Sequence, residues 1–312
     1  MSHILVVGLN PAWQTVLGFR DFRAGEVNRA RSGESLASGK GFNAAKVLRR
    51  LGHKVSLLQI LGGENGSKCL RACEALGIES LHAWVGTETR RCLTLLHRDA
   101  SLPGDAPDPE EVGAAPGEST EIIEPFRVEE PGAGEALIAS LPPDPEAFDA
   151  VAICGTVPPG AGEGIYDAVL DRLRPKVTVV DAWQGLRPGS LAKATCLKMN
   201  RSEYRTLSES AGAEAADALF LVTSGGGEAL VLRGGATLAR LAPPRLASVA
   251  NSIGAGDAVT AGVVHHLLSG LDAAEAFRHG LAMGSASCLE RLPAEFQDAE
   301  FRRLLPLVRV LP

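Results

Sequence analysis

The stretch NSIGAGDAVTAG, residues 251–262, combines a glycine-rich turn, one acid and the start of a predicted helix. The first N–H groups of a helix have no partner within the helix, and the helix dipole makes this end partly positive, so such a turn can hold an anion. Asp257 could accept the proton of an attacking hydroxyl while the amides of Gly254, Ala255 and Gly256 stabilise a transferring phosphoryl group. A purely structural N-cap aspartate has the same sequence, and this stretch alone favours that simpler interpretation.

A second glycine cluster, ASGKGFNAAKVLRRLG, places Gly39, Lys40 and Gly41 directly before another predicted helix. The spacing excludes a Walker A loop, because Gly33 lies one residue too far from Gly39 and Gly41 stands where that motif has Ser or Thr. The first predicted strand is not followed by G-x-G-x-x-G, so a dehydrogenase of the Rossmann type lacks its fingerprint. What remains is a backbone anion site with a lysine, suited to a small polyhydroxylated or phosphorylated ligand.

The elements that must position these clusters alternate along the chain. Apolar runs rich in β-branched residues predict strands at Ile4–Leu9, Val55–Leu61, Val151–Ile153, Val177–Val180 and Leu219–Val222. Helical patterns follow at Phe42–Leu51, Ser67–Leu76, Ile165–Leu173, Ala255–Leu268 and Ala273–Leu289. This alternation predicts a parallel sheet covered by helices, and 312 residues fit one large α/β domain over 1–312.

Two segments, 12–36 and 82–128, lack a helical period, and we expect them to form a small β-layer off the main sheet. The second contains a stretch rich in proline, glycine and acids, which cannot bury enough apolar surface to order itself strongly. For residues 99–119 the favoured interpretation is therefore a mobile surface loop.

Charge and composition exclude several classes of protein. A net charge of −6 argues against a nucleic-acid partner, because affinity for a polyanion rests on a basic surface. The six cysteines show no C-x-x-C spacing, so neither a zinc site nor a disulfide framework is indicated, and free thiols in a reducing compartment are expected. No apolar run approaches the roughly 20 residues needed to span a bilayer, and no signal peptide is evident. We expect a cytoplasmic protein without a membrane partner.

The two clusters, in this order and at opposite ends of the chain, resemble the ribokinase-like sugar kinases of the phosphofructokinase B family. The likeness is greatest to its 1-phosphofructokinase and tagatose-6-phosphate kinase branch. It is carried by LNPA at residues 9–12, GEVNRA at 25–30, SGKGFNAAKVLRRLG at 38–52, GTVPPG at 155–160, KMNRSE at 198–203 and LVTSGGGEALVL at 221–232, besides NSIGAGDAVTAG. The resemblance spans nearly the whole chain. It implies a three-layer α/β/α sandwich in which a β-sheet lid, formed by about 12–36 and 82–128, covers the sugar.

The resemblance also implies roles for individual residues. The catalytic residues are Asp257 as the base and Gly254, Ala255 and Gly256 as the anion hole. The sugar would be bound by Asn10, Gln14, Gly39, Lys40, Asn43 and Arg90, with Arg90 at the substrate phosphate. ATP would be bound by Lys198, Asn200, Thr223, Gly225, Gly227 and Gly254, and Mg²⁺ organised, largely through water, by Asn200 and Glu203. A monovalent cation and a homodimer through the lid are further features that the resemblance allows.

The expected activity is therefore an ATP- and Mg²⁺-dependent kinase of a sugar phosphate, in first place a ketohexose phosphate. Two departures keep alternatives open: Gln14 stands where the family usually has Asp, and Cys92 where it usually has Asn. One alternative is a kinase of an unphosphorylated sugar or nucleoside. The other, from a different class, is a sugar-sensing binding protein without turnover.

Overall fold

The centre of the molecule is a mixed β-sheet. The computed structural model describes residues 1–20, 22–97, 119–211 and 217–312, and within these ranges the main sheet has ten strands in the order β14-β13-β12-β11-β10-β9-β8-β1-β4-β5. In chain order they are β1 (His3–Val7), β4 (Lys54–Gly62), β5 (Glu79–Val85), β8 (Ala150–Cys154), β9 (Val177–Asp181), β10 (Cys196–Asn200), β11 (Leu219–Thr223), β12 (Ala229–Arg233), β13 (Ala236–Ala242) and β14 (Arg309–Leu311). Neighbours from β5 to β11 run parallel, and those from β11 to β14 run antiparallel.

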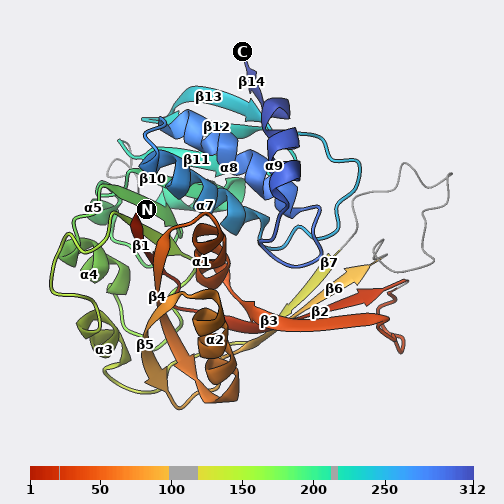
Figure 1. Cartoon of the computed structure of the whole chain (residues 1–312). Coiled ribbons are helices and arrows are strands. Elements are labelled where there is room, and N and C mark those ends of the chain that lie inside the picture. The colour runs from red at the N-terminus through yellow and green to blue at the C-terminus, as the bar shows by residue number, and fades with distance from the viewer. Residues whose placement is uncertain (21, 98–118, 212–216) are drawn as a thin grey trace.

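Helices cover both faces of this sheet, because its strands are apolar on both sides. In β1, Ile4 and Val6 join one core and Leu5 and Val7 join the other. The helices are α1 (Lys40–Arg50), α2 (Gly63–Leu76), α3 (Ala133–Ala139), α4 (Ile165–Arg172), α5 (Pro188–Leu191), α6 (Arg201–Ala211), α7 (Ala255–Leu268), α8 (Ala273–Ser287) and α9 (Asp298–Leu304), with the 3₁₀ turn η3 at Leu305–Leu307. The first core takes side chains from α1, α2, α7, α8 and α9, and the second from α3 to α6 (Figure 1). The predicted three-layer α/β/α sandwich is confirmed.

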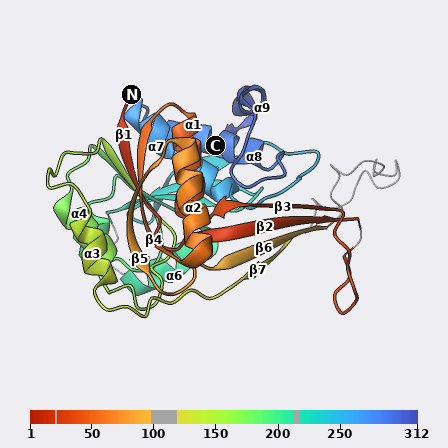
Figure 2. The same ribbon diagram turned by 60° about the horizontal axis from the view of Figure 1, so that its bottom comes forward.

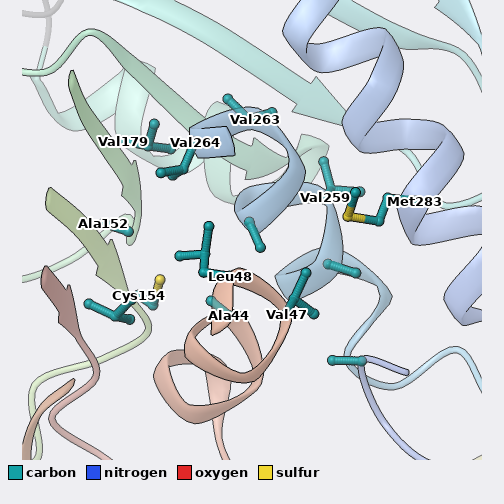
Figure 3. Close-up of a cluster of buried hydrophobic side chains, with 14 of the residues drawn as sticks. Ala44, Val47, Leu48, Ala152, Cys154, Val179, Val259, Val263, Val264 and Met283 are labelled. Carbon is teal, nitrogen blue, oxygen red and sulfur yellow. The ribbon is translucent and has the colours of Figure 1, made fainter. Parts of the chain in front are cut away.

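The helices that carry the two glycine clusters pack against each other in the first core. Figure 3 shows Val47 and Leu48 of α1 facing Val259, Val263 and Val264 of α7, with the side chains of β8 and β9 at the left of the same cluster. Glycine also lets α1 approach the end of β1, because a methyl group on Gly41 would lie 2.3 Å from the Cα of Gly8. The sequence therefore fixes α1 closely against the centre of the sheet.

A second sheet extends away from the main body (Figure 2). It has the strand order β3-β2-β6-β7, formed by β2 (Ala12–Phe19), β3 (Ser32–Ser38), β6 (Arg91–His97) and β7 (Ser119–Ile123). The strands lie in the two segments expected to form a β-layer, but the predicted boundaries need correction. Residues 82–85 belong to β5, which pairs with β4 in the main sheet, and β3 continues to Ser38. Residues 124–128 follow the last strand, and Phe126 and Val128 pack into the second core.

The predicted surface loop at 99–119 lies outside the described residues, apart from Ser119, which begins β7. All ten strands and helices expected from the sequence are present, with ends that differ by a few residues. Over the part of the chain that the structure describes, none of the helices combines the length and apolarity needed to cross a bilayer.

Candidate active site

The candidate site lies where the order of the parallel strands reverses. β1 pairs with β4 on one side and with β8 on the other, although β4 and β8 are far apart in the sequence. Ligands of open α/β sheets bind at the carboxyl ends of the strands next to such a switch point. Asn10 follows β1, Asp181 ends β9, Asn200 ends β10 and Thr223 ends β11, so all four lie along this edge.

The start of α7 has the form expected of an anion site. Gly254 adopts φ 80°, a left-handed conformation that glycine tolerates and other residues resist. The preceding turn is held by Asn251, whose Oδ1 accepts a hydrogen bond from the N–H of Ile253 at 2.9 Å. A methyl group on Gly254 would lie 2.6 Å from the backbone nitrogen of Ala294, and one on Gly256 would lie 3.0 Å from the Lys198 ammonium. The backbone of Ala294 and the positive φ therefore require glycine at 254, whereas a side chain at 256 would crowd the Lys198 ammonium.

Asp257 lies in the first turn of α7 and is only 7% exposed. Its Oδ2 accepts a hydrogen bond from the Asn43 side-chain amide at 2.7 Å, which joins the two glycine clusters. Burial raises the pKa of Asp257 to about 6, and the nearby charge of Asp181 acts in the same direction, while Asn43 and the lysines Lys40 and Lys198 lower it. The helix end favours the charged form of this carboxyl, but desolvation has the larger effect on its pKa. A carboxyl that titrates near neutral pH is well matched to general base catalysis.

Asp181 is the main residue that sequence reasoning did not identify. It is 2% exposed, and its Oδ1 accepts a hydrogen bond from the Lys40 ammonium at 3.1 Å. Its Oδ2 accepts from the Lys198 ammonium at 3.0 Å and from the Thr260 hydroxyl at 2.6 Å. Burial alone would raise the pKa of Asp181, but Lys198, Lys40 and Thr260 hold it well below its ordinary value. A signal was available, since an acid that directly follows the predicted strand Val177–Val180 must end at the functional edge of the sheet.

Asn200 and Glu203 form a reciprocal capping box at the start of α6. Glu203 Oε2 accepts from the Asn200 N–H at 2.8 Å, and Asn200 Oδ1 accepts from the Glu203 N–H at 2.9 Å. The other Glu203 oxygen, Oε1, lies 3.7 Å from the Lys40 ammonium. The pair therefore caps the start of α6, and it also places one carboxylate oxygen beside the Asp181 and Lys40 cluster.

This donor set fits Mg²⁺ held mainly through water and phosphate. Two of the side-chain oxygens of Asn200 and Glu203 are already used by the cap, which leaves Glu203 Oε1 as a hard oxygen donor. Within the described ranges, no group of three or more His, Cys, Asp or Glu side chains is arranged to hold a metal ion. Mg²⁺ commonly keeps several waters and is bound by one or two carboxylates together with substrate phosphates.

The first glycine cluster lies opposite α7. Gly39 adopts φ 104°, where the chain turns from β3 into α1, and a methyl group there would lie 3.1 Å from the Cα of Pro11. Asn43 is 3% exposed, and its Oδ1 accepts a hydrogen bond from the Ser38 hydroxyl at 3.3 Å. The turn thus fixes Asn43 toward Asp257 and brings Lys40 to Asp181.

Arg90, Asn10 and Gln14 lie at the junction of the two sheets. The Arg90 guanidinium donates to the backbone carbonyls of Asn10 at 3.0 Å and Pro11 at 3.4 Å. The Asn10 amide donates to the Thr156 hydroxyl at 3.2 Å, and its buried Oδ1 has no hydrogen-bond partner among the residues that the structure describes. Gln14 is 2% exposed and donates to the Thr94 hydroxyl of β6 at 2.6 Å. Lys40 is also among the residues expected to bind the sugar. Its ammonium pairs with Asp181 and Glu203, whereas the Arg90 guanidinium donates to the carbonyls of Asn10 and Pro11.

The predicted nucleotide residues fall on adjacent strand ends. Thr223 is paired in register with Asn200 across β10 and β11, and its hydroxyl donates to the Met199 carbonyl at 3.3 Å. The turn that follows contains Gly225 at φ 54°, and the N–H of Gly227 donates to the Ser224 carbonyl at 2.8 Å. The turn after β11 therefore lies at the same edge of the sheet as Asn200, next to the end of β10.

Together these groups can support phosphoryl transfer to a hydroxyl. The buried Asp257, with a pKa of about 6, lies in the first turn of α7, and the charges of Lys40 and Lys198 are near enough to lower its pKa. A base, an anion site and fixed cations are the parts that such a transfer requires, because catalysis of this step is mostly positioning and electrostatic stabilisation.

Comparisons with known proteins agree with this chemistry. The family model of pfkB family carbohydrate kinases matches residues 1–103 and 135–299. A 1-phosphofructokinase of Rhodobacter capsulatus is 29% identical over 297 residues, which cover 88% of this chain and 87% of that protein. The fold is shared with Escherichia coli phosphofructokinase-2 in complex with fructose-6-phosphate (TM-score 0.74, 18% identity, 98% of this chain and 99% of that one). It is also shared with a ribokinase of Thermotoga maritima (TM-score 0.70, 17% identity, 98% and 100%).

Proposed function

The chain belongs to the pfkB family of carbohydrate kinases, and we propose that it transfers the γ-phosphoryl group of ATP to a hydroxyl of a ketohexose phosphate. The substrate would be of the kind used by 1-phosphofructokinases or tagatose-6-phosphate kinases. The observation that carries the proposal is the buried Asp257, with a pKa of about 6, at the start of α7 beside Lys40 and Lys198. The similarity to a 1-phosphofructokinase over most of both chains supports the choice of a sugar phosphate.

In the proposed reaction, Asp257 accepts the proton of the acceptor hydroxyl as that oxygen attacks the γ-phosphorus, and the bond from this phosphorus to the β,γ-bridging oxygen breaks so that ADP leaves. The amides of residues 254–256 and the ammonium groups of Lys40 and Lys198 stabilise the charge on the transferring group. Mg²⁺, when bound with ATP near Glu203, would neutralise charge on the phosphates. The second sheet would act as the lid that excludes water, so that the sugar hydroxyl and not water is the acceptor.

The acceptor phosphate would bind at Arg90. Its contacts with the carbonyls of Asn10 and Pro11 hold the guanidinium in one orientation, and its remaining N–H groups would bind the phosphate. The buried, unpartnered Oδ1 of Asn10 lies in the same region and would accept a hydrogen bond from the sugar.

The experiment is ATP consumption over fructose 1-phosphate, tagatose 6-phosphate, fructose 6-phosphate, the free ketohexoses and nucleosides. The matched pair of variants is Arg90→Ala and Arg91→Ala, because Arg91 is next in sequence but pairs with Glu124 and is 66% exposed. We expect Arg90→Ala to lower kcat/KM for the sugar phosphate by about 10- to 100-fold, the equivalent of one charged hydrogen-bonding contact. Arg91→Ala should stay near wild type. Equal losses on phosphorylated and free sugars would favour a kinase of an unphosphorylated sugar or nucleoside.

Location and assembly form part of the same proposal. The six cysteines all have free thiols, which supports a reducing compartment such as the cytoplasm. A homodimer through the second sheet stays a prediction, since the exposed Ile122 and Ile123 of the edge strand β7 point to opposite faces of that sheet. A requirement for a monovalent cation stays a prediction, to be checked by assays in potassium and in a bulky organic cation.

A further inference from the structure

Asp181 connects four elements of the site through one buried carboxylate. Lys40 comes from α1, Lys198 from β10 and Thr260 from α7, while Asp181 itself ends β9. Each of the three side chains donates to it at 2.6–3.1 Å. A carboxylate that is 2% exposed needs such partners, because an unpaired buried charge is costly.

The arrangement does more than neutralise a buried charge. The two ammonium groups occupy different oxygens of Asp181, so each lysine has its own fixed direction. Lys198 is held so close to the first turn of α7 that its ammonium would lie 3.0 Å from a methyl group on Gly256. Thr260 follows Asp257 by one helical turn, and its hydroxyl ties that turn to the same carboxylate. Both cations are therefore oriented relative to the proposed anion site and base.

We propose that Asp181 is a positioning residue, which acts on phosphoryl transfer by holding Lys40 and Lys198 at the start of α7. The inference rests on the proposed kinase function, since the ammonium groups would there face the transferring phosphoryl group. In this role Asp181 acts through its lysine partners, to which its two oxygens are hydrogen-bonded.

The charge of Asp181 has a second effect on the site. Burial and Asp181 both raise the pKa of Asp257, whereas Lys40 and Lys198 lower it. Without its negative charge, Asp181 no longer raises the pKa of Asp257, and it no longer offsets the positive charges of Lys40 and Lys198. Both changes lower the pKa of Asp257. The acid limb of the pH–rate profile should then move to lower pH.

The test compares Asp181→Asn with Asp167→Asn. Asp167 is also 2% exposed and accepts hydrogen bonds from the Arg187 backbone, but it lies at α4. For Asp181→Asn we expect kcat to fall by about 10- to 100-fold, the loss of a charge-assisted contact made in the transition state. KM for ATP should stay within about 3-fold, because released ammonium groups can still pair with bound phosphates. Asp167→Asn should leave kcat and the pH profile unchanged.

A readout that needs no activity completes the test. The carboxyl ¹³C shift of Asp257, followed against pH in the protein without substrates, should show a lower pKa in Asp181→Asn than in wild type. If Asp181→Asn does not fold, Thr260→Val removes one hydrogen bond to Asp181 while the Asp181 charge is retained, and it should lower kcat by about 3- to 10-fold. Thr260→Ser keeps the hydroxyl and should keep wild-type rates.

Two results would overturn the inference while leaving the kinase function intact: a wild-type kcat with an unshifted Asp257 titration, or a raised KM for ATP with kcat unchanged. Inactivity of the wild-type protein on every sugar and nucleoside would instead refute the proposed function. In that case the ¹³C titration still decides whether Asp181 controls Asp257.

Discussion

Replacement of Asp257 by Asn separates the catalytic role of this carboxyl from its cost to the fold. Asn retains the shape and can still accept the hydrogen bond from Asn43, but it cannot take a proton from the acceptor hydroxyl. We therefore expect kcat to fall by about 10²- to 10⁴-fold, the usual contribution of a general base.

The same change should stabilise the protein at neutral pH. The pKa of Asp257 is about 6 in the folded chain, against an ordinary value of 3.8, because burial disfavours the charged form. The folded state therefore binds the proton more tightly, and wild-type stability falls as pH rises from about 4 through 6. A difference of about two pKa units, each equivalent to about 1.36 kcal/mol, gives about 3 kcal/mol. Asn cannot ionise, so the variant should exceed wild type by up to that amount at pH 8 and by much less at pH 4.

The measurements are kcat under saturating substrates and the free energy of unfolding from urea denaturation at pH 4, 6 and 8. A fall in kcat of less than about 10-fold would remove Asp257 from the role of base. A stability difference that is the same at pH 4 and pH 8 would contradict the argument from a buried charge, whatever the kinetic result.

Three further predictions concern the same site. In the wild type, kcat/KM should fall as pH drops through about 6, because protonated Asp257 cannot accept the hydroxyl proton, and a pH–rate profile measures this. Gly254→Ala should cost at least about 2 kcal/mol of stability in thermal or urea unfolding, since it combines a positive φ with a clash against Ala294. Gly270→Ala, at φ 88° with no described atom within 4 Å, should cost only about 1 kcal/mol. Gln14→Asp should raise kcat/KM for fructose 1-phosphate or tagatose 6-phosphate relative to the substrate that the wild type prefers; unchanged ratios would show that Gln14 does not distinguish sugars.

The central elements were predictable because their signals are local. The buried parallel strands show as short apolar runs, and α1 and α7 follow glycine turns, so β1, β4, β8, β9 and β11 and both helices were expected at nearly their observed positions. The main-sheet strands β5, β10, β12, β13 and β14 were not predicted. In β5 and β13, partly or fully exposed residues weaken the apolar pattern. The lid boundary at residue 82 was wrong for the same reason, because β5 is indistinguishable in sequence from a strand of the second sheet until its pairing with β4 is known.

The sequence by itself determined the chemistry of the individual site residues: an acid at a helix start, a glycine turn that exposes amides, and a lysine in a second turn. The tertiary structure alone decided which of these residues meet. Asn43 and Asp257 are 214 residues apart in sequence, and Lys40 and Asp181 are 141 apart, yet both pairs are hydrogen-bonded. Turn and helix signals extend over only a few residues, whereas these contacts depend on strand order, which brings the carboxyl ends of parallel strands to one edge. The perturbed pKa of Asp257 has the same origin, because burial and the charge of Asp181 exist only once the layers have packed.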